Sequence, residues 1–540
     1  MARGHSLQNV PIPRFPRARF NLSHSVTTSM DVGTLYPIDW QEVVPGDVFK
    51  CRAFDVSRVT SSFLKPVMDN LYLDVYHFFV PHRLVYDNFE KVFGNPNPSA
   101  YTDNALEEIP MSYGVVKPGT VADYLGLPIG SISRDSPVSV LPFRSFALIY
   151  DKYFRNENTT DEVYIQRKGF SLSEVFGEQP FGPNSYCGKL PKVNKYKDYF
   201  TSCVPNPQKG APVSFNFIDR APVCTTSDDV FTGIREPLKF NIAASGAPFS
   251  QPHSLIVDGK TLSTDNVTFS GQIGSRLYPS NLFADLTNAN AITVDDLRLA
   301  FAYQKMLERD AIYGSRYNEY LYGHFGVHVP DAYIQFPQYL GGGRTPLNIV
   351  QVAQTSQGTE ESPLGNVGAY SWTNGHTGYS RNFKEHGIVM TVACLRYRHT
   401  YQQGIAKKWR RRVREDFYDP LFSTIGQQPV YTTELYAQAG PEAVFGYREA
   451  WSELRSVPNT ISGEMRSGAT NSLDIWHFAD NYSSAPTLSQ SFTEETPAYV
   501  DRTLSVPSSS QDNFILNFFF DMSAVRKMPV YSMPSLIDHH

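Results

Sequence analysis

Apolar and polar residues alternate in several stretches of the chain, and this period of two is typical of β-strands. Two such stretches lie near the N-terminus, at residues 48–53 and 71–81, and Pro81 ends the second. Two similar stretches lie far along the chain, in residues 386–401 and 512–530. The pattern predicts one sheet system built from both ends of the chain, with a long insertion between them.

Two helices are predicted between these stretches. A short helix is expected at roughly residues 83–93, after Pro81 has ended the strand. A longer helix is expected over residues 293–314, because Thr293 can cap its start and Gly314 can end it. The apolar residues of the longer helix keep a period of about 3.6 residues, which predicts a buried stripe. The stripe consists of Leu297, Ala300, Phe301, Leu307 and Ala311.

Two segments show little regular pattern. Residues 1–35 are predicted to form an extended arm, because three early prolines disfavour regular structure. The basic residues of this arm are Arg14, Arg17 and Arg19. Residues 201–291 are rich in Ser, Thr, Asn, Pro and Gly, which predicts exposed loops with short strands. Such loops either contact a receptor or host, or form a variable surface with no particular function.

The composition indicates that much apolar surface is buried. Of the 540 residues, 19% are charged and 14% are aromatic, whereas globular proteins have about 25% charged residues. A long chain that is poor in charge and rich in Tyr, Phe and Arg is typical of a subunit of a permanent assembly. A large secreted β enzyme has a similar composition, so both classes stay open.

The cysteines and the N-terminus indicate the compartment. The five cysteines form no C-x-x-C pair, which favours buried thiols in a reducing cytosol over disulfides or a zinc site. They are Cys51, Cys187, Cys203, Cys224 and Cys394. We find no apolar signal region at the N-terminus and no apolar run near the ~18 residues of a membrane helix. The protein is therefore expected in a cytoplasm, or in an assembly formed there, without membrane insertion.

Catalytic and metal-binding patterns are limited to short matches. Ser62 and Lys65 have the S-x-x-K spacing of penicillin-interacting enzymes, but the accompanying triplets are missing. Residues 341–343 are three glycines without the lysine of a phosphate loop, so a surface turn is predicted there. The pairs at 360–361 and 494–495 are glutamates, which we expect to be solvated loop charges. No metal-ligand spacing connects His376, His386, His399 and His477. We predict no enzyme activity, cofactor or metal.

One short segment is strongly basic although the chain has a formal net charge of -5. The stretch QQGIAKKWRRRVREDFYDP places six cations around Trp409. These cations are Lys407, Lys408, Arg410, Arg411, Arg412 and Arg414. A helix would bury a stripe of four apolar residues and turn the cations outward, whereas an extended segment would divide the cations between two faces. The stripe is Ile405, Trp409, Val413 and Phe417.

Long stretches of the chain resemble the major capsid proteins of the microviruses, specifically those of the gokushovirus branch. The resemblance includes FNLSHSVTTSMDVGTLYPIDWQEVVPGDVF, YHFFVPHRLVYDNFEKVFG, LPFRSFALIYDKYFRNEN and KDYFTSCVPNPQKG in the first half. It continues with DDLRLAFAYQKMLERDAIYGSRYNEYLYGHFGV, LRYRHTYQQGIAKKW, FGYREAWSELRSVPNTISGEMR, LDIWHFAD and MPVYSMPSLIDHH. It is weakest in residues 215–286 and in RRRVREDFYDP.

The resemblance implies a mainly β fold. The expected fold is an eight-stranded viral jelly roll, an antiparallel β-sandwich with long, partly helical insertions between strands. After an arm at 1–35, residues 36–540 would form this single domain, with a large insertion at about 95–385. A protrusion loop at about 201–291 would lie on the outside of the domain.

The resemblance also implies function and partners. Many copies of the chain would self-assemble into a small icosahedral shell around a circular single-stranded DNA. Other virion proteins and a host cell-surface receptor would be further partners, the receptor contacting the protrusion loop. The protein would be located in the virion, after assembly in the cytoplasm of a host bacterium. A β-sandwich carbohydrate-active enzyme and a DNA-binding module are the alternative functions.

Within such a shell the basic segment has three interpretations. Its cations would neutralise DNA phosphates while Trp409 stacks on a base. Alternatively, they would form a salt-bridge cluster, within the chain or with a neighbouring subunit, or a solvated surface. The arm residues Arg14, Arg17 and Arg19 are a second candidate for DNA contact.

Overall fold

The structure of the chain is a computed structural model. It describes residues 17–93, 107–168, 176, 179–182, 185–211, 294–314, 316–332, 335–353 and 367–531, with six short strands between 223 and 284. The chain forms two compact units. The larger unit is Met1–Pro207 together with Glu308–His540, and the smaller is Gln208–Leu307.

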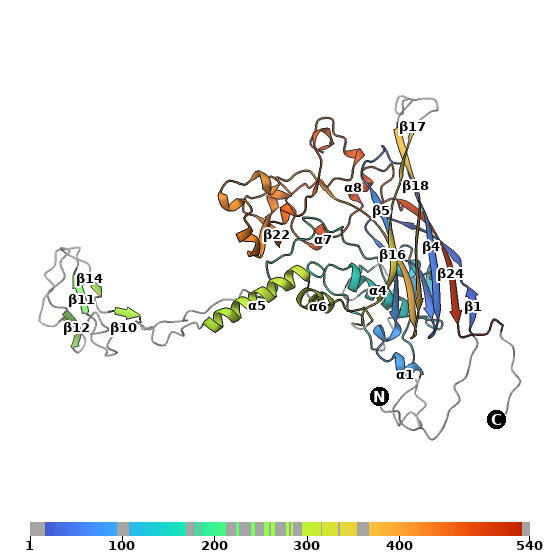
Figure 1. Ribbon diagram of the computed structural model, residues 1–540, viewed down its shortest axis with the longest axis horizontal. Helices are drawn as coiled ribbons and strands as arrows, with labels where there is room; N and C mark the ends of the chain where they lie inside the picture. Colours follow the sequence, from blue (N-terminus) through green and yellow to red (C-terminus); the bar gives the residue numbers. More distant parts are fainter. Residues whose placement is uncertain are drawn as a thin grey trace, which may run out of the picture. The chain divides into compact units, whose positions relative to one another are not determined.

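The larger unit contains a six-stranded antiparallel sheet (Figure 1). Its strands are β1 (Ala18–Asn21), β2 (His24–Met30), β4 (Val48–Val59), β17 (Ile349–Ala353), β18 (Val367–Asn382) and β24 (Phe514–Arg526). The order is β1-β24-β4-β18-β17, and β2 also pairs with β24. The C-terminal strand β24 therefore lies between strands from the N-terminal part of the chain, as the alternating pattern predicts.

A four-stranded antiparallel sheet packs against the six-stranded sheet. Its strands are β3 (Leu35–Val43), β5 (Leu71–Pro81), β16 (Gln338–Pro346) and β19 (Gly387–Tyr397), in the order β16-β5-β19-β3. Eight of these strands form the antiparallel sandwich that the jelly-roll resemblance implies, so the predicted fold class is confirmed. They are β2, β3, β4, β5, β16, β18, β19 and β24, in the orders β2-β24-β4-β18 and β16-β5-β19-β3. The strands β1 and β17 are additional members of the six-stranded sheet.

The predicted N-terminal arm is wrong for its second half. Residues 18–30 form β1 and β2, which pair with β24 in the register Ala18 to Arg526 and His24 to Phe520. Alternation in HSVTTSM and pairing with β24 outweigh the effect of the earlier prolines. Residues 1–16, with Arg14, lie outside the described residues.

The main core lies between the two sheets. In β24, the side chains of Phe514, Leu516, Phe518 and Phe520 are buried, while the residues between them face outward. From the four-stranded sheet, Leu73, Phe79, Val389 and Leu395 enter the same core. Burial of this apolar surface stabilises the sandwich by about 25 cal/mol per Å².

The other face of the four-stranded sheet is also covered. The helix α4 (Leu141–Ile149) is buried at every position and packs with Phe78 and Met390 in a second core. Consequently every residue of β19 except Arg396 is buried. Small elements of this region are β6 (Met111–Ser112), β7 (Gly114–Val116), α3 (Val121–Tyr124), β8 (Gly130–Ile132) and β9 (Val138–Ser139).

The predicted limit of the insertion is wrong at its C-terminal end. The strands β16, β17 and β18 belong to the two sheets although they lie within residues 95–385. The glycines at 341–343, predicted as a surface turn, are part of β16. A side chain on Gly342 would lie 2.5 Å from the carbonyl oxygen of Val75, so close approach of the paired strands requires glycine.

The predicted helices are partly confirmed. The short one is divided into η1 (His82–Leu84) and α1 (Phe89–Phe93). The long helix α5 (Val294–Tyr313) is present and ends at Gly314, whose φ of +95° favours glycine. Its predicted buried stripe is wrong, because Leu297 and Phe301 are exposed and only Ala311 is buried. A second helix, α6 (Tyr317–Phe325), follows.

The smaller unit contains two small antiparallel sheets. Strands β10 (Val223–Thr225) and β15 (Leu282–Ala284) form one pair. The other sheet contains β11 (Lys239–Ile242), β12 (His253–Asp258), β13 (Thr261–Thr264) and β14 (Leu277–Pro279). The short strands predicted within residues 201–291 are therefore confirmed.

The C-terminal part of the larger unit consists mainly of loops with short elements. These are β20 (Thr400–Tyr401), β21 (Gln427–Tyr431), β22 (Val444–Glu449), β23 (Asn459–Thr460), α7 (Gln490–Thr493) and α8 (Ala498–Asp501). The prediction of buried thiols is confirmed for the four cysteines in the described residues, namely Cys51, Cys187, Cys203 and Cys394. Burial raises the pKa of Cys51 to about 12, which keeps this thiol protonated and unreactive.

Candidate nucleic-acid interface

The basic segment between β20 and β21 is an exposed loop. It contains two single turns of 3-10 helix, η3 (Lys407–Trp409) and η4 (Arg414–Asp416). The carboxylate of Asp416 accepts hydrogen bonds from the backbone N–H groups of Arg412 and Val413, at 2.7 and 3.0 Å. This tight turn replaces the bonds of a continuous helix.

The apolar stripe that a helix would bury is therefore exposed. Trp409 is 77% exposed, and Ile405, Val413 and Phe417 are between 37 and 55% exposed. The helical alternative for this segment is wrong. An exposed tryptophan among cations is what a stacking platform for nucleic acid bases requires.

The cations of the segment have different surroundings. Arg411 is half-buried, its Nη2 lies 3.4 Å from Oε1 of Glu453, and its guanidinium lies over the Phe417 ring. Lys407 Nζ donates a hydrogen bond to Oε1 of Gln428. Within the described part of the chain, the other four cations form no ion pair. These are Lys408, Arg410, Arg412 and Arg414.

A pocket of about 830 Å³ opens beside this segment. Lys407, Lys408, Trp409 and Arg411 line one side of it, and Arg466 adds a further cation. The remaining wall includes the aromatic and aliphatic residues Tyr199, Phe200, Leu454, Val457 and Ile461. A flat apolar ring with an attached anion fits this lining, because the ring contacts apolar walls while the anion meets the cations.

Two carboxylates in the pocket wall have assigned partners. Glu453 pairs with Arg411, and Glu434 accepts a hydrogen bond from the hydroxyl of Tyr199 at 3.0 Å. Burial raises the pKa of Glu434. The cations that remain without a carboxylate are thus available for a negatively charged partner.

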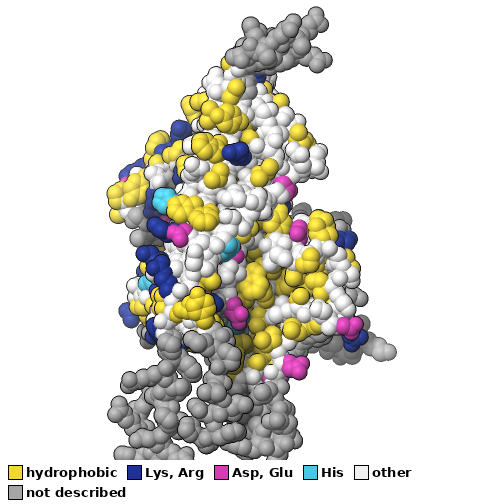
Figure 2. Space-filling model, turned by 90° about the vertical axis from the view of Figure 1, so that its right-hand side faces the viewer, with side chains coloured by type: hydrophobic (Ala, Val, Ile, Leu, Met, Phe, Trp, Pro, Cys, Tyr) yellow, Lys and Arg dark blue, Asp and Glu magenta, His cyan; other side chains and the backbone are white. Residues whose placement is uncertain are grey.

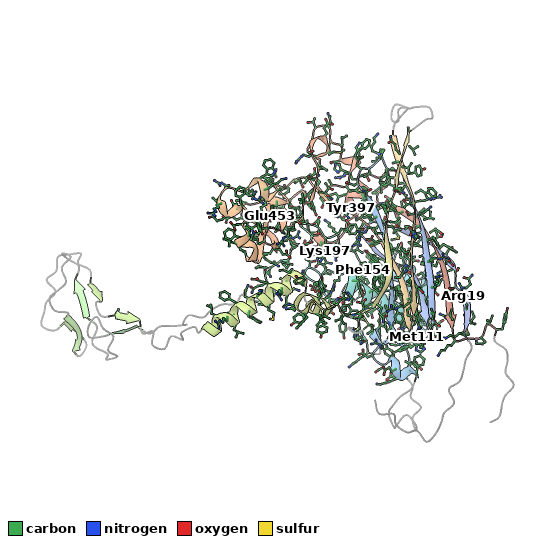
Figure 3. All side chains as sticks on the ribbon, in the orientation of Figure 1. Arg19, Met111, Phe154, Lys197, Tyr397 and Glu453 are labelled. Atoms are coloured by element: carbon green, nitrogen blue, oxygen red, sulfur yellow. The ribbon has the colours of Figure 1, made fainter. Side chains whose placement is uncertain are left out.

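The two predicted clusters of arginines and lysines do not form one patch. Arg17 and Arg19 are exposed at β1, at the edge of the six-stranded sheet. Figure 3 shows Arg19 far from Glu453, which marks the position of Arg411. Arg14 lies outside the described residues.

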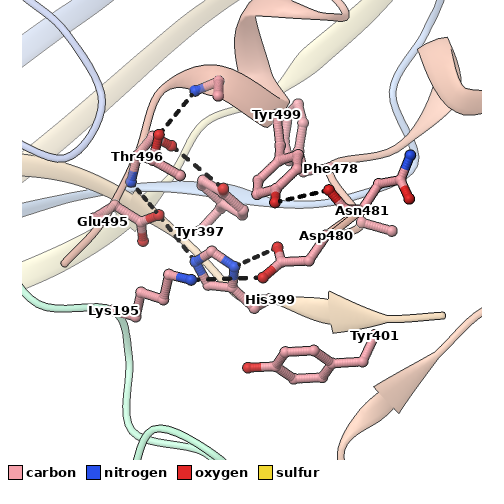
Figure 4. Close-up of polar contacts among 12 residues, drawn as sticks. Lys195, Tyr397, His399, Tyr401, Phe478, Asp480, Asn481, Glu495, Thr496 and Tyr499 are labelled. Carbon is pink, nitrogen blue, oxygen red and sulfur yellow. Dashed lines mark hydrogen bonds and ion pairs between the residues drawn. The ribbon is translucent and has the colours of Figure 1, made fainter. Parts of the chain in front are cut away.

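Sequence reasoning missed a buried ionic cluster that follows β19 (Figure 4). His399 Nδ1 lies 2.6 Å from Asp480 Oδ1, and His399 Nε2 lies 2.9 Å from Glu495 Oε1. Lys195 Nζ lies 3.5 Å from Asp480, and the hydroxyl of Tyr482 donates to Asp480. Glu495, predicted as a solvated loop charge, is therefore buried in an ion pair.

The electrostatics of this cluster favour a charged imidazole. Burial lowers the pKa of His399, but the carboxylates of Glu495 and Asp480 outweigh burial and raise it to about 9. The imidazolium of His399 and the ammonium of Lys195 in turn hold the pKa of Asp480 below its usual value, against the effect of burial. The side chains of His399, Asp480 and Glu495 are at most 1% exposed, so substrate has no access to them. The cluster joins segments that are far apart along the chain, and for this reason no sequence motif marks it.

A second buried ion cluster holds the strands of the four-stranded sheet. Asp74 on β5 is buried and pairs with Arg344 Nε at 2.7 Å and Arg396 Nε at 3.1 Å. The Tyr196 ring lies 4.1 Å from the guanidinium of Arg344 and 4.4 Å from that of Arg396. Three segments are thereby joined around one carboxylate.

Neither a metal site nor a membrane helix is found in the described residues. No group of three or more His, Cys, Asp or Glu side chains in that part of the chain is arranged to hold a metal ion. Among the same residues, none of the helices is both long and apolar enough to span a bilayer.

Known proteins match the chain over almost its whole length. The family described as capsid protein (F protein) matches residues 8–536. Capsid protein VP1 of Spiroplasma virus 4 is 38% identical, over 99% of this chain and 98% of the relative. Capsid protein VP1 of Bdellovibrio phage phiMH2K is 34% identical over 98% of this chain and 97% of the relative. The corresponding protein of Chlamydia phage 1 is 32% identical over 99% and 100%. These matches confirm the resemblance to microvirus capsid proteins, and the chain belongs to the capsid protein (F protein) family as a structural protein of the virion, not an enzyme.

Proposed function

We propose that copies of this chain close into a shell around circular single-stranded DNA, and that the segment Lys407–Arg414 contacts this DNA. Membership in a capsid family over residues 8–536 supports assembly into a shell of many copies. The observation that carries the DNA contact is the exposed Trp409 beside four cations without ion pairs and a pocket of about 830 Å³.

Binding of DNA by this chain depends on local charge. With a net charge of -5, the chain as a whole does not attract a polyanion, so local basic patches must bind the phosphates. Each phosphate that a Lys or Arg neutralises releases counterions. Stacking of a base on Trp409 adds about 1 to 3 kcal/mol.

The test is the triple variant Lys408→Ala, Arg410→Ala, Arg412→Ala. Shells are expected to form with less DNA, because these side chains have no ion pair within the described part of the chain. The salt dependence of oligonucleotide binding should fall by about 2 in the log–log slope, at roughly 0.7 per phosphate contact. DNA per particle is measured from absorbance and particle mass.

A matched control removes three exposed cations elsewhere, at Arg134, Arg167 and Lys168. This control should package the normal amount of DNA. If the test variant formed no shells while the control did, the segment would be a contact between subunits instead. If the test variant packaged normal amounts of DNA, the segment would be a solvated surface.

Arg411 is left out of the triple variant because its role differs. Its ion pair with Glu453 and its contact with Phe417 hold the loop in place. Arg411→Ala is expected to weaken DNA contact only by loosening the loop, and Arg411→Lys should restore part of it.

Attachment to the host is proposed for residues 201–291. The strands β10 to β15 give this insertion its own small sheets, which supports an element that folds separately from the sandwich. Replacing the hairpin His253–Thr264 by a Gly-Ser linker in the full chain should leave particles intact but reduce adsorption to host cells. Unchanged adsorption would contradict this role. We further propose assembly in the host bacterial cytoplasm, with other virion proteins as partners.

A further inference from the structure

The six-stranded sheet buries only one of its faces. The residues of β4 and β24 that point away from the core include two phenylalanines, Phe54 and Phe519, which are 42% and 44% exposed. On the neighbouring strand β18, Trp372 is 50% exposed. Large aromatic side chains left in water at a sheet surface indicate that a partner covers them.

The strand register places these rings in rows with cations. Phe54 lies opposite Phe519 on one side and opposite His376 on the other. Four residues along β4, Arg58 lies between Trp372 and Ile515. Directly opposed residues in antiparallel strands have Cβ atoms about 5 Å apart, so each row is a continuous surface.

Basic, aromatic and aliphatic residues follow one another along the outward face of β4. The outward residues of β4 are Val48, Lys50, Arg52, Phe54, Val56 and Arg58. Rows follow each other at about 6.8 Å, because side chains on one face are two residues apart. The row of Phe54 therefore lies one step from the row of Arg52 and two steps from the row of Arg58, which also contains Trp372.

The face carries a net positive charge. Arg52 is paired with Asp521 at 2.6 Å, and Asp521 is the one carboxylate among the described strand residues of this face. Lys50 and Arg58 have no ion pair within the described part of the chain, and Arg19 extends the basic surface to β1. Figure 2 shows hydrophobic and basic side chains side by side on this side of the molecule, with acidic side chains also visible there.

The mixture of aromatic and basic residues on this face distinguishes between two possible partners, a second subunit and a single-stranded nucleic acid. The centre of a permanent subunit interface is depleted in charged residues, whereas here cations are interleaved with the rings. Surfaces that bind single strands combine a basic track for phosphates with aromatic rings on which bases stack. A net positive face on a chain of net charge -5 is complementary to a polyanion.

We propose that the exposed face of the six-stranded sheet binds single-stranded DNA, with bases stacked on Phe54, Phe519 and Trp372 and phosphates held by Lys50 and Arg58. This surface is separate from the segment Lys407–Arg414. The inference rests on the proposed role of the chain as a shell around single-stranded DNA, and it assigns the sheet as a second, larger contact.

The first experiment measures binding of a fluorescent oligothymidylate to the purified full-length chain. The variant Phe54→Ala, Phe519→Ala is expected to bind at least about 30-fold more weakly, because each of the two lost stacking contacts weakens binding by about fivefold or more. The variant Lys50→Gln, Arg58→Gln should lower the log–log salt slope by about 1.4, at roughly 0.7 per contact. The control Tyr164→Ala removes a ring that is 67% exposed but lies outside every strand, and should bind normally.

The second experiment irradiates purified particles and maps the peptides cross-linked to the packaged DNA. Cross-links in β4 and β24 are expected, and they should disappear in Phe54→Ala, Phe519→Ala. The inference would be overturned if the variant Phe54→Ala, Phe519→Ala bound the oligonucleotide with normal affinity and wild-type particles gave no cross-links in β4 and β24. Loss of shell assembly with normal oligonucleotide affinity would also overturn it, because the face would then be a contact with a second copy of the chain.

These tests can reject the two proposed DNA contacts independently of each other. If only the variants of the sheet bind normally, the inference is wrong and the role of Lys407–Arg414 stands. If only the variant Lys408→Ala, Arg410→Ala, Arg412→Ala binds normally, the basic segment is excluded and the sheet remains. Particles without DNA in the wild type would reject both.

Discussion

The two sheets of the sandwich differ in how many of their faces are buried. In the four-stranded sheet, β19 has the sequence GIVMTVACLRY and is buried along both faces, between the main core and α4. In the six-stranded sheet, β24 has the sequence FILNFFFDMSAVR and is buried at alternate positions only. A continuous apolar run thus marks a strand covered twice, and strict alternation marks a strand covered once.

The comparison extends to the charged side chains. The four-stranded sheet buries its carboxylate Asp74 between two arginines, whereas the six-stranded sheet displays Asp521 and Arg52 at its surface. What is unusual is that the open face of the six-stranded sheet still carries large aromatic residues. The difference between the two sheets therefore identifies the open face of the six-stranded sheet as a candidate binding surface.

The largest effects are expected from phenylalanines on the two central strands. Phe78→Ala and Phe79→Ala should each lower the free energy of unfolding by about 3 to 5 kcal/mol, because these neighbours fill cores on opposite faces of β5. In β24, Phe518→Ala should cost as much, while Phe519→Ala should change it by less than about 1 kcal/mol. Chemical denaturation of the dissociated subunit measures all four. Equal losses for Phe518→Ala and Phe519→Ala would mean that the six-stranded sheet is covered on both faces within one subunit.

The next largest effect is expected at the carboxylates. Asp74→Ala leaves the half-buried Arg396 without a carboxylate to balance its charge and should cost about 3 kcal/mol or more. Asp521→Ala breaks an exposed pair with Arg52 and should cost less than about 1 kcal/mol. Denaturation at two salt concentrations distinguishes the buried pair from the exposed pair, since salt ions screen the exposed pair much more strongly. A similar cost for both substitutions would contradict the assignment of buried and open faces.

A smaller effect on the free energy of unfolding is expected when pH changes the charge of His399, which follows β19. The pKa of His399 is about 9 in the folded chain, whereas its ordinary value is 6.5. The contribution of the charged imidazole to the free energy of unfolding is therefore complete below pH 6.5 and is lost as pH rises through 9. The loss is up to about 3 kcal/mol, because each tenfold change in proton affinity corresponds to about 1.4 kcal/mol. His399→Gln should flatten the decline in unfolding free energy across this window.

His24, at the edge of the six-stranded sheet, is the comparison for His399. Its hydrogen bond with Asp39 also raises its pKa to about 9, but this imidazole is 31% exposed and solvent screens the pair. His24→Gln should therefore change the same slope less than His399→Gln does. The opposite order would show that the cluster of His399, Asp480 and Glu495 does not stabilise the fold through its charge.

Several elements of the fold follow from the sequence because local pattern and tertiary contacts agree. The alternation of Phe49, Cys51 and Ala53 with Lys50 and Arg52 predicts both the strand and its inner face. The end of α5 at Gly314 follows from a residue that adopts positive φ. Pairing of β24 with strands from the other end of the chain follows from their shared period.

Other elements depend on contacts that no local pattern contains. The glycines at 341–343 look like a turn, but their lack of side chains is needed for close pairing of β16 with β5. The stripe around Trp409 has a helical period, yet the Asp416 carboxylate closes a turn that excludes the helix. Glu495 looks like a loop charge until His399 is brought beside it by the fold.

For the candidate site, the sequence identified the residues but not their environment. The composition of the basic segment was visible, whereas the separation of Arg411 from the four unpaired cations came from its contact with Glu453. The open sheet face was missed because its aromatic and basic residues come from β4, β18 and β24. Only the register of these strands places them in rows.

The most direct test is electron cryo-microscopy of purified, DNA-containing particles, at a resolution that shows side chains. We predict that the exposed face of β4 and β24 lines the interior of the shell, with nucleic acid density against Phe54 and Phe519. The account would be contradicted if a neighbouring subunit covered this face, or if the face lay on the outer surface of the particle.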